Sequence, residues 1–586
     1  MVAKRTKRAK QVKREEVVLP SFAIRRYTVI SIFALAAGVL VWRAVDQQIL
    51  EKDFLQSEGA DRYLDRVDMV AHRGLITDRR GDVLALSTPV DSITANPRVL
   101  RADSPALAPL AESMGMELDD LRRKLARYSQ RRFVYLKRRL PPSNAAHVMD
   151  VAKAYKVRGV HVEREYRRYY PAGEVFSHVL GFTNAEDDGQ EGLELAYDQA
   201  LRGEAGAKLV LRDGRRQVVD DVENIQSPRD GKNLALSLDS RLQFIAYREL
   251  KAAVKKHRAV SGSAVLLDAK TGEVLAMVNQ PGYNPNKSKS NKNGRLRNRA
   301  MTDVFEPGST MKPFAVAAAL ELGTIKSGSI IDTSPGFFKV GTSRVKDKHD
   351  LGRIDVSTVL RKSSNVGAGK IAMTLDKEDF WRVLDGFGFG QPLSTGFPAE
   401  ASGQLISHKN WAEIDQATLS FGYGISTSTL QLAQAYAVLA NDGVLQPVSL
   451  LKVDQPEAGR RVISDQTAVD VRHMLETVVS NTGTAPLAAV SGYRVAGKTG
   501  TVKKLGRNGY SDNRYVGVFA GMAPVSDPRL VMVAMLNEPR GRQYYGGLVA
   551  GPMFAKVMAE SLRLLNVKPD VLVQKPVHLA QLGETQ

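Results

Sequence analysis

A serine and a lysine three residues apart could form a nucleophile and its base. Ser309 and Lys312 follow a Pro-Gly break, and the apolar, alanine-rich residues 314–322 predict a helix that Gly323 ends. We therefore expect Ser309 at or near the first residue of a buried helix, with Lys312 on the same face. Free backbone N–H groups and the positive end of the helix dipole would favour a developing oxyanion there. The lysine can act as base if burial and neighbouring cations keep its amine partly neutral.

A Ser-x-x-Lys pair alone is weak evidence, since the chain repeats it at Ser343 and at Ser449. Only the combination of Ser309 with two later polar motifs has both the right order and plausible structural contexts. The first is Ser363-Ser364-Asn365, about fifty residues on, and the second is Lys498-Thr499-Gly500-Thr501, which follows an apolar run. The alternative interpretation is three unrelated polar turns.

Two similar motifs stand in the wrong order. Lys270-Thr271-Gly272 precedes the serine, and Ser511-Asp512-Asn513 follows the last motif. We interpret both as hairpin turns, the first between strands at 264–267 and 273–278, the second just before a strand at 514–520.

The ordered motifs resemble those of penicillin-binding proteins and serine β-lactamases. Residues 298–313, 420–424 and 544–547 are similar to one branch, the division-specific class B penicillin-binding proteins, which are the septal peptidoglycan D,D-transpeptidases (FtsI type) of Gram-negative bacteria. The resemblance runs from the basic N-terminal tail to about residue 565. It implies a serine-type D-Ala-D-Ala transpeptidase whose substrate is a pentapeptide stem and whose inhibitors are β-lactams.

The resemblance and the side-chain chemistry together suggest a role for each motif. Ser309 attacks the penultimate carbonyl, Lys312 is the base, and a nearby Lys498 cation helps to keep that base neutral. Ser363 relays a proton to the leaving amine, and Asn365 holds Lys312 and a substrate amide.

The last motif is expected to bind the substrate. Lys498, Thr499 and Thr501 offer a cation and two hydroxyls to the terminal carboxylate, and Gly500 keeps the strand clear of side chains. The backbone N–H groups of Ser309 and Thr501 form the oxyanion hole. Tyr423, Tyr544 and Tyr545 line the cleft, or else belong to the core or a surface loop.

Hydrolysis and other functions remain alternatives. The Glu-x-x-Leu-Asn motif of class A β-lactamases is absent from residues 366–497, which favours a long-lived acyl-enzyme awaiting an amine. The rivals are an elongation-specific class B transpeptidase, a D,D-carboxypeptidase that uses water, and a non-catalytic β-lactam sensor or scaffold. The extended basic tail and the motif context favour division.

The composition and net charge restrict the classes of partner that the protein is expected to bind. The net charge of +20 is partly local, because residues 1–26 hold nine Lys/Arg and two Glu, which leaves about +13 for the rest. Without any helix-turn-helix or zinc-ligand pattern, we expect no nucleic acid; anionic lipid or cell-wall polymer fits better. The chain has no cysteine, and we expect no cofactor and no metal.

An uncharged stretch at 27–42, bracketed by arginines, predicts a membrane anchor. The alternative is a cleaved signal peptide, because Ala34-Leu35-Ala36 mimics a cleavage site. We expect residues 1–21 to form a cytoplasmic basic tail and 22–45 an uncleaved, single-pass transmembrane signal anchor in the bacterial inner membrane. The positive-inside rule then makes the rest periplasmic.

The 586 residues predict a mixed α/β protein. We expect an N-terminal α+β pedestal, non-catalytic and held together by Arg, Asp and Glu, at 46–235. A transpeptidase domain follows at 236–566, an antiparallel sheet flanked by helices, and then a flexible tail at 567–586. Strands are expected at 514–520 and 530–536 with an edge at 495–502, and helices at 119–128, 144–155, 241–256, 310–322 and 429–441. By resemblance, the partners are stem peptides (D-Ala-D-Ala donor, amine acceptor), the septal glycosyltransferase of the FtsW type and other divisome membrane proteins.

Overall fold

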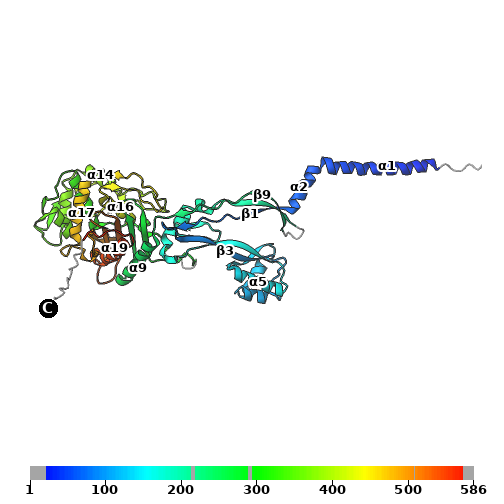
Figure 1. Cartoon of the computed structure of the whole chain (residues 1–586), viewed down its shortest axis with the longest axis horizontal. Coiled ribbons are helices and arrows are strands. Elements are labelled where there is room, and N and C mark those ends of the chain that lie inside the picture. Colours follow the sequence, from blue (N-terminus) through cyan, green and yellow to red (C-terminus); the bar gives the residue numbers. More distant parts are fainter. Residues whose placement is uncertain (1–21, 213–217, 288–293, 507–508, 572–586) are drawn as a thin grey trace, which may run out of the picture. The chain divides into compact units, whose positions relative to one another are not determined.

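The computed structural model describes residues 22–212, 218–287, 294–506 and 509–571 (Figure 1). It divides into two compact units, one of residues 1–70 with 205–229 and one of residues 71–204 with 230–586. The predicted basic tail at 1–21 and the tail beyond residue 571 lie outside the described residues. Residues 567 and 570, at the start of that tail, bind the catalytic domain, because Tyr493 Oη donates to the Val567 carbonyl and the Arg494 amide donates to Asp570.

The first unit contains the predicted anchor. Helix α1 (Ala23–Val45) continues through a π-helical turn (Asp46–Leu50) and is followed by α2 (Lys52–Tyr63). Residues 23–50 are long and apolar enough to cross a membrane, with a mean hydropathy of 2.0 and no buried positions in the most apolar window. A three-stranded antiparallel sheet in the order β1 (Leu64–Met69), β8 (Gly206–Arg212), β9 (Val218–Gln226) completes this unit.

The N-terminal part of the second unit is an α+β module. Strand β3 (Val83–Ala95) pairs with both β4 (Val134–Leu140) and β5 (Val160–Tyr169), and β2 (Ile76–Thr77) and β10 (Leu234–Ala235) extend the sheet. Helices α3 (Leu107–Ser113), α4 (Leu118–Arg127) and α5 (Pro142–Ala154) share a small apolar core with these strands, which includes Ile93 and Leu121. The two amphipathic helices predicted here are confirmed as α4 and α5.

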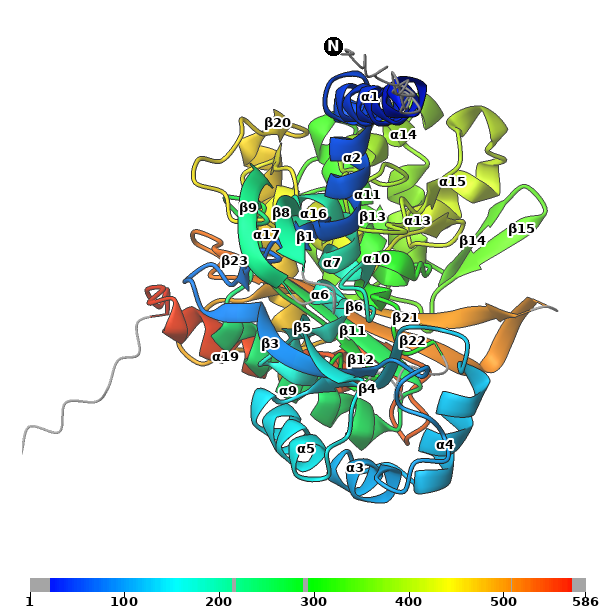
Figure 2. The same ribbon diagram turned by 90° about the vertical axis from the view of Figure 1, so that its right-hand side faces the viewer.

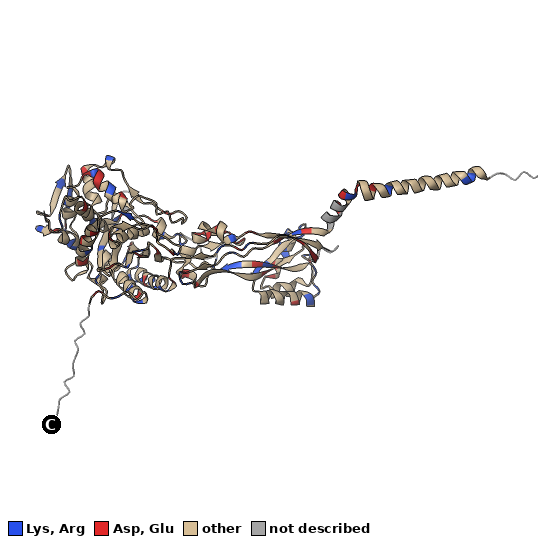
Figure 3. Ribbon diagram, turned by 45° about the horizontal axis from the view of Figure 1, so that its top comes forward, with Lys and Arg blue, Asp and Glu red and all other residues tan. Residues whose placement is uncertain are grey.

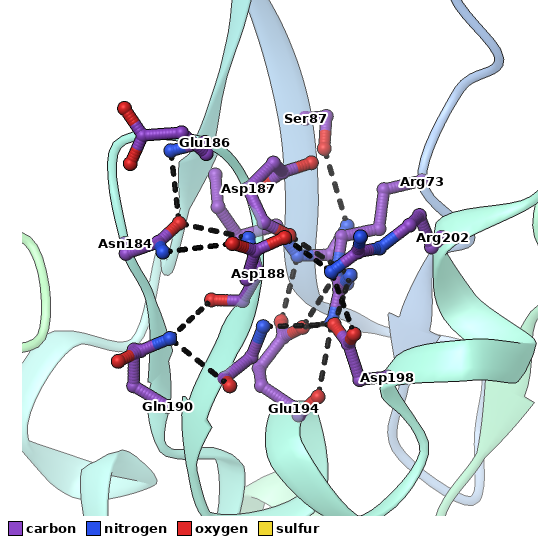
Figure 4. A network of polar contacts seen from close by, with 12 residues as sticks. Arg73, Ser87, Asn184, Glu186, Asp187, Asp188, Gln190, Glu194, Asp198 and Arg202 are labelled. Carbon is purple, nitrogen blue, oxygen red and sulfur yellow. Dashed lines mark hydrogen bonds and ion pairs between the residues drawn. The ribbon is translucent and has the colours of Figure 1, made fainter. Parts of the chain in front are cut away.

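A buried ionic network ties this module together (Figure 4). Glu194 accepts from Arg73 Nε at 2.8 Å and from Arg168 Nε at 2.7 Å, and all three side chains are buried. Arg73 also donates to Asp198 at 2.8 Å, and Arg202 donates to the same carboxylate. The predicted Arg/Asp/Glu network is therefore present, and it joins β5 to α7 (Gly192–Ala196) and α8 (Asp198–Arg202). The other short elements of this region are a 3₁₀ turn (Gly173–Val175), α6 (Ser177–Leu180), β6 (Phe182–Thr183) and β7 (Gly189–Glu191).

A five-stranded antiparallel sheet organises the rest of the second unit. Its order is β12 (Val274–Gln280), β11 (Ser261–Asp268), β23 (Leu530–Asn537), β22 (Gly509–Ala523), β21 (Ala496–Gly506). The residues of β11 are all buried, so helices cover both faces of the sheet. The predicted strands and the predicted edge at 495–502 are confirmed.

The sheet's helices fall into two groups (Figure 2). Helices α9 (Ser240–His257) and α19 (Gly551–Leu564) pack on each other and on the sheet, whereas α16 (Thr429–Ala440) packs on β11, β22 and β23. Helix α11 (Lys312–Glu321) is fixed by Phe314, whose ring meets the rings of Phe387, Phe389 and Tyr436 edge-on. The remaining helices are α10 (Arg299–Thr302), α12 (Val356–Lys362), α13 (Asn365–Ala372), α14 (Lys377–Gly386), α15 (Glu413–Leu419), α17 (Asp465–Val479) and α18 (Gly546–Val549), with 3₁₀ turns at His408–Asn410 and Pro486–Ala488.

In the described part of the domain, two-stranded ribbons are formed by β13 (Ile330–Asp332) with β16 (Arg353–Asp355), β14 (Phe337–Val340) with β15 (Ser343–Lys346), β17 (Gln404–Leu405) with β18 (Ile425–Ser426), and β19 (Val444–Leu445) with β20 (Arg460–Arg461).

One predicted turn is correct and the other is wrong. Lys270-Thr271-Gly272 forms the β11–β12 turn, with Gly272 at a φ of +74°. Ser511-Asp512-Asn513, however, lies inside β22, because β21 and β22 remain paired as far as Gly506 and Gly509. The prediction failed because pairing along an edge hairpin extended the strand past its last apolar residues.

Candidate active site

Ser309 lies in a 3₁₀ turn (Gly308–Met311) that runs directly into α11. The predicted position, near the first residue of a buried helix, is therefore correct, although the first turn is 3₁₀ rather than α. Gly308 has a φ of +58°, and a Cβ there would lie 2.3 Å from Val502 of β21. Glycine at this position lets the edge strand approach the nucleophile.

Lys312 lies beneath Ser309 and is fully buried. Its Nζ is 3.1 Å from Ser309 Oγ, and it donates to the Ser363 carbonyl at 2.5 Å and to Asn365 Oδ1 at 2.8 Å. Burial, and then the charge of Lys498, hold the pKa of Lys312 well below its usual range. A neutral amine has two N–H groups, and these can donate to the Ser363 carbonyl oxygen and to Asn365 Oδ1. The lone pair of the nitrogen is then free to accept the Ser309 proton.

Ser363 joins the two lysines. It ends α12 in the left-handed region, at a φ of +60°, while Ser364 caps α13 by accepting from the Gly367 amide at 2.8 Å. The Ser363 Oγ is 3.1 Å from Lys312 Nζ and 3.0 Å from Lys498 Nζ. A continuous path of hydroxyls and amines thus runs from Ser309 to Lys498.

Lys498 is the second fully buried amine of the site. It lies on the edge strand β21, and burial lowers its pKa from 10.5 to about 7. Among the ion pairs between described residues, none joins a carboxylate to Lys312 or Lys498. The two amines are therefore desolvated without direct compensation, which is the kind of pKa perturbation that marks a functional site.

We expect Lys498→Met to stabilise the fold, and to do so most at neutral pH. An unfolded lysine titrates near 10.4 and the folded one near 7, so the unfolded chain binds more protons between these values and wild-type stability rises with pH there. The advantage of the variant should be largest at and below pH 7, up to about 5 kcal/mol, and should shrink towards pH 10. Urea unfolding of both proteins at pH 7, 8.5 and 10 measures it. An advantage independent of pH would contradict a depressed Lys498 pKa.

Asp347, which the sequence motifs did not indicate, supports the second motif. Its Oδ1 accepts from the backbone amides of Asn365 and Val366, at 2.5 and 3.2 Å, and its Oδ2 accepts from Ser364 Oγ. A carboxylate at the start of α13 is favoured by the helix dipole. Its charge also raises the pKa of Lys312, against the larger effect of burial. An acidic residue some sixteen positions before a Ser-x-Asn motif is too common a pattern to be noticed without the fold.

The third motif lies on the edge strand β21, close to the turn that holds Ser309. A Cβ on Gly500 would lie 2.8 Å from the Pro307 carbonyl oxygen, so the absence of a side chain permits the close approach. Thr501 Oγ1 accepts from the Gly546 amide at 2.9 Å, and Thr499 Oγ1 is 3.1 Å from Thr484 Oγ1. Among the strands that the structure describes, β21 pairs with β22 alone, so its outer side is open to an added strand. The oxyanion hole assigned to the Ser309 and Thr501 amides stays a prediction.

Two of the three predicted aromatic residues stand beside the third motif. The ring of Tyr544 stacks on Tyr515 at 4.2 Å and on Tyr545 at 4.5 Å, and Gly546 follows directly. Lys348 lies over the Tyr545 ring at 4.5 Å and donates to its hydroxyl at 3.1 Å. The stack therefore reaches from the third motif towards the segment that holds Asp347.

Tyr423 belongs to a different group. It packs with Phe421 and, edge-on at 5.4 Å, with Tyr510. The Tyr510 hydroxyl donates to the carboxylate of Glu306, which also accepts from the Gly424 amide at 3.1 Å. Tyr423 thus packs against neighbouring aromatic rings at the edge of the site. A substrate contact for any of the three tyrosines stays a prediction.

The serines of the other two Ser-x-x-Lys pairs, Ser343 and Ser449, lack such neighbours. Ser343 begins strand β15 of a two-stranded ribbon, and Ser449 Oγ donates to the Leu451 carbonyl at 2.7 Å. Ser309 alone of the three is hydrogen-bonded to a buried lysine among the described residues. The site, placed between a helix start and a sheet edge, has the arrangement of a serine acyl-transfer enzyme, and the role of Lys312 as base stays a prediction.

Comparison with known proteins agrees with this class. Residues 262–559 match the penicillin binding protein transpeptidase domain, and residues 68–236 match the penicillin-binding protein dimerisation domain. The chain is 40% identical over 563 residues to a probable peptidoglycan D,D-transpeptidase PenA of Neisseria meningitidis, covering 95% of this chain and 96% of the relative. It is also 40% identical over 544 residues to the peptidoglycan D,D-transpeptidase FtsI of Escherichia coli K12, covering 92% and 91%.

A solved structure is similar as well. The apo transpeptidase domain of Burkholderia pseudomallei penicillin-binding protein 3 is 46% identical, with a TM-score of 0.54 over 57% of this chain and 98% of that one. The chain belongs to the class B penicillin-binding proteins of the FtsI type.

Proposed function

We propose that this chain is a peptidoglycan D,D-transpeptidase that cross-links stem peptides at the division septum through an acyl-enzyme on Ser309. The path Ser309 Oγ–Lys312 Nζ–Ser363 Oγ–Lys498 Nζ, with steps of 3.1, 3.1 and 3.0 Å, carries the proposal. It gives the nucleophile a base and gives the abstracted proton a route to a leaving group.

Acylation uses the two lysines in different protonation states. Neutral Lys312 takes the Ser309 proton as Oγ bonds to the penultimate carbonyl carbon. The C–N bond to the terminal D-alanine then breaks, and Ser363 passes a proton to the leaving amine. Lys498, whose pKa of about 7 leaves it partly charged at neutral pH, lies where a terminal carboxylate would raise that pKa and hold the cation.

Transfer to an amine completes the cycle. The amine of a second stem attacks the ester carbonyl, its extra proton returns through Lys312 to Ser309, and a new peptide bond replaces the one that broke. A β-lactam acylates Ser309 in the same way, but its leaving amine stays tethered, which blocks the acceptor.

The apolar helix α1 supports a place at the membrane. With the basic tail retained in the cytoplasm by the positive-inside rule, the catalytic domain would be periplasmic in the inner membrane of the cell. The similarity to FtsI favours the division septum over the elongating wall, and a polytopic glycosyltransferase of the FtsW type as partner.

Product analysis distinguishes transpeptidation from hydrolysis. With a donor ending in D-Ala-D-Ala and increasing glycine as acceptor, we expect the transferred peptide to replace the hydrolysed one while D-alanine release continues. Mass spectrometry of the products measures the ratio. A hydrolysed product that persists unchanged at high acceptor concentration would indicate a carboxypeptidase, and acylation without any turnover would indicate a sensor.

The anchor can be tested separately. Removal of residues 1–45 should leave a soluble protein that still binds a fluorescent penicillin, since α1 has no buried residues. The same truncation, exported to the periplasm of a strain depleted of the full chain, should fail to support division. Full complementation by the exported truncation would show that the anchor is dispensable.

A further inference from the structure

A cationic cavity lies where the N-terminal module meets the segment after β12. Its volume is about 220 Å³. The module lines it with three arginines, Arg139 of β4 and Arg167 and Arg168 of β5, together with Tyr170 and Thr183. The catalytic domain contributes Pro285 and Asn286. Figure 3 shows basic and acidic residues interspersed along the strands of this region, whereas the cavity itself is lined by basic and neutral residues only.

The positive charge in this cavity is incompletely balanced. Among the described residues, no ion pair joins Arg139 or Arg167 to a carboxylate. Two carboxylates act on Arg139 at a distance: Glu165, which is itself held by Arg138 at 2.8 Å and by Ser92, and Asp187, which also acts on Arg73 and Arg168. Burial and the neighbouring charges of Arg138 and Arg167 lower the pKa of Arg139, so an anion here would relieve repulsion.

Two guanidinium donors remain unused. Arg168 is 3% exposed, and its Nη2 has no hydrogen-bond partner among the described residues, although Nε and Nη1 donate to Glu194 and Ser87. Arg139 Nε is likewise buried without a partner, while its Nη2 donates to the Ala185 carbonyl at 2.8 Å. A buried N–H of a charged group without an acceptor is unfavourable, so such donors point to a missing acceptor.

The cavity is held rigid from both sides. Glu194 fixes Arg168 through the network of Figure 4. Asn286 accepts from the Tyr170 amide at 3.0 Å and donates to the Tyr170 carbonyl at 2.9 Å, and Arg167 donates to the Asn286 carbonyl at 3.0 Å. The donors are therefore preorganised, and an occupant would contact both the module and the catalytic domain.

We propose that this cavity is a binding site for a tetrahedral oxyanion of the phosphate class. Arginines of two strands, β4 and β5, line it, which suits a tetrahedral acceptor; a planar carboxylate is already satisfied by one guanidinium fork. The volume admits a phosphate or a phosphate monoester. The bound anion would link the two parts of the second unit, through Arg139 and Arg168 on one side and the 285–286 segment on the other.

Calorimetric titration of the full chain in detergent micelles tests the site. Sodium phosphate is added in an oxyanion-free Tris chloride buffer at constant ionic strength, with sodium chloride as the blank. We expect saturable one-to-one binding that Arg139→Gln weakens about tenfold or more and Tyr170→Phe weakens less. Arg382→Gln, a surface arginine of α14 paired with Glu378 and Asp379, is the matched control and should bind as wild type does. Acylation by a fluorescent penicillin checks that each variant is folded.

Each outcome of the titration bears directly on the proposed oxyanion site. No saturable binding by wild type, or equal loss in Arg382→Gln, overturns the proposal. If Arg139→Gln does not fold, unchanged affinity in Tyr170→Phe overturns it as well. Acetate binding at least as tightly as phosphate overturns the tetrahedral assignment. Tighter binding of glycerol 1-phosphate than of inorganic phosphate assigns the site to an ester headgroup, and the reverse assigns it to the free ion.

Discussion

Lys312→Arg should slow acylation of Ser309 by about 10²–10⁴-fold, because the variant loses general-base assistance. Arginine retains the positive charge and much of the side-chain length, but it stays protonated at any working pH. The wild-type amine is fully buried 3.1 Å from Ser309 Oγ, and its pKa is held well below the usual range. Stopped-flow acylation by a chromogenic β-lactam measures the rate, and thermal unfolding checks the fold.

Two further variants make this test sharper. Lys312→Met keeps an unbranched side chain of similar length without charge or lone pair, and should be as slow as Lys312→Arg. Lys556→Arg, on the exposed side of α19 where it pairs with Glu249, is the matched control and should acylate normally. A folded Lys312→Arg protein that acylates within about threefold of wild type would remove Lys312 from the base role. The proton would then leave through Ser363 towards Lys498.

Ser309→Ala should abolish covalent capture of β-lactams altogether. The hydroxyl is the atom that forms the ester, and no neighbouring side chain can replace it. Intact-mass spectrometry after exposure to a penicillin should show one adduct per wild-type chain and none on the variant. Peptide mapping of the wild-type adduct should locate it within the tryptic peptide that contains Ser309.

The two competing Ser-x-x-Lys pairs provide the controls. Ser343→Ala and Ser449→Ala should each retain a full adduct, because neither serine contacts a buried lysine. An adduct mapped to Ser343 or Ser449, or one that survives in Ser309→Ala, would contradict the assignment of the nucleophile.

Local sequence signals were enough for most elements of the catalytic domain. The alanine-rich helix after Ser309, the β11–β12 hairpin with its turn at Gly272, and the strands at 514–520 and 530–536 depend on periodicity and turn chemistry within a few residues. The order of the three motifs carried the class of chemistry. These features depend on residues close together in the sequence or on the order of motifs along it, so they can be predicted from the sequence alone. The strand at 511–513 was missed because the β21–β22 hairpin continues beyond its last apolar residues, so hairpin pairing overrode the polar composition.

Only the tertiary structure decided how the motifs act on one another. Ser363 Oγ comes within 3.1 Å of Lys312 and 3.0 Å of Lys498 because α12, α11 and an edge strand from some 135 residues later pack together. The depressed pKa of each lysine is a consequence of that burial and cannot be read from spacing. The roles of Asp347 and of the cavity arginines without an ion pair likewise depend on neighbours that are distant in sequence. The sequence thus determined the motif order and predicted the nucleophile and the anchor. Packing decided the pKa of the lysines, the contacts of Asp347 and the unused donors, because desolvation and long-range contacts exist only in the folded chain.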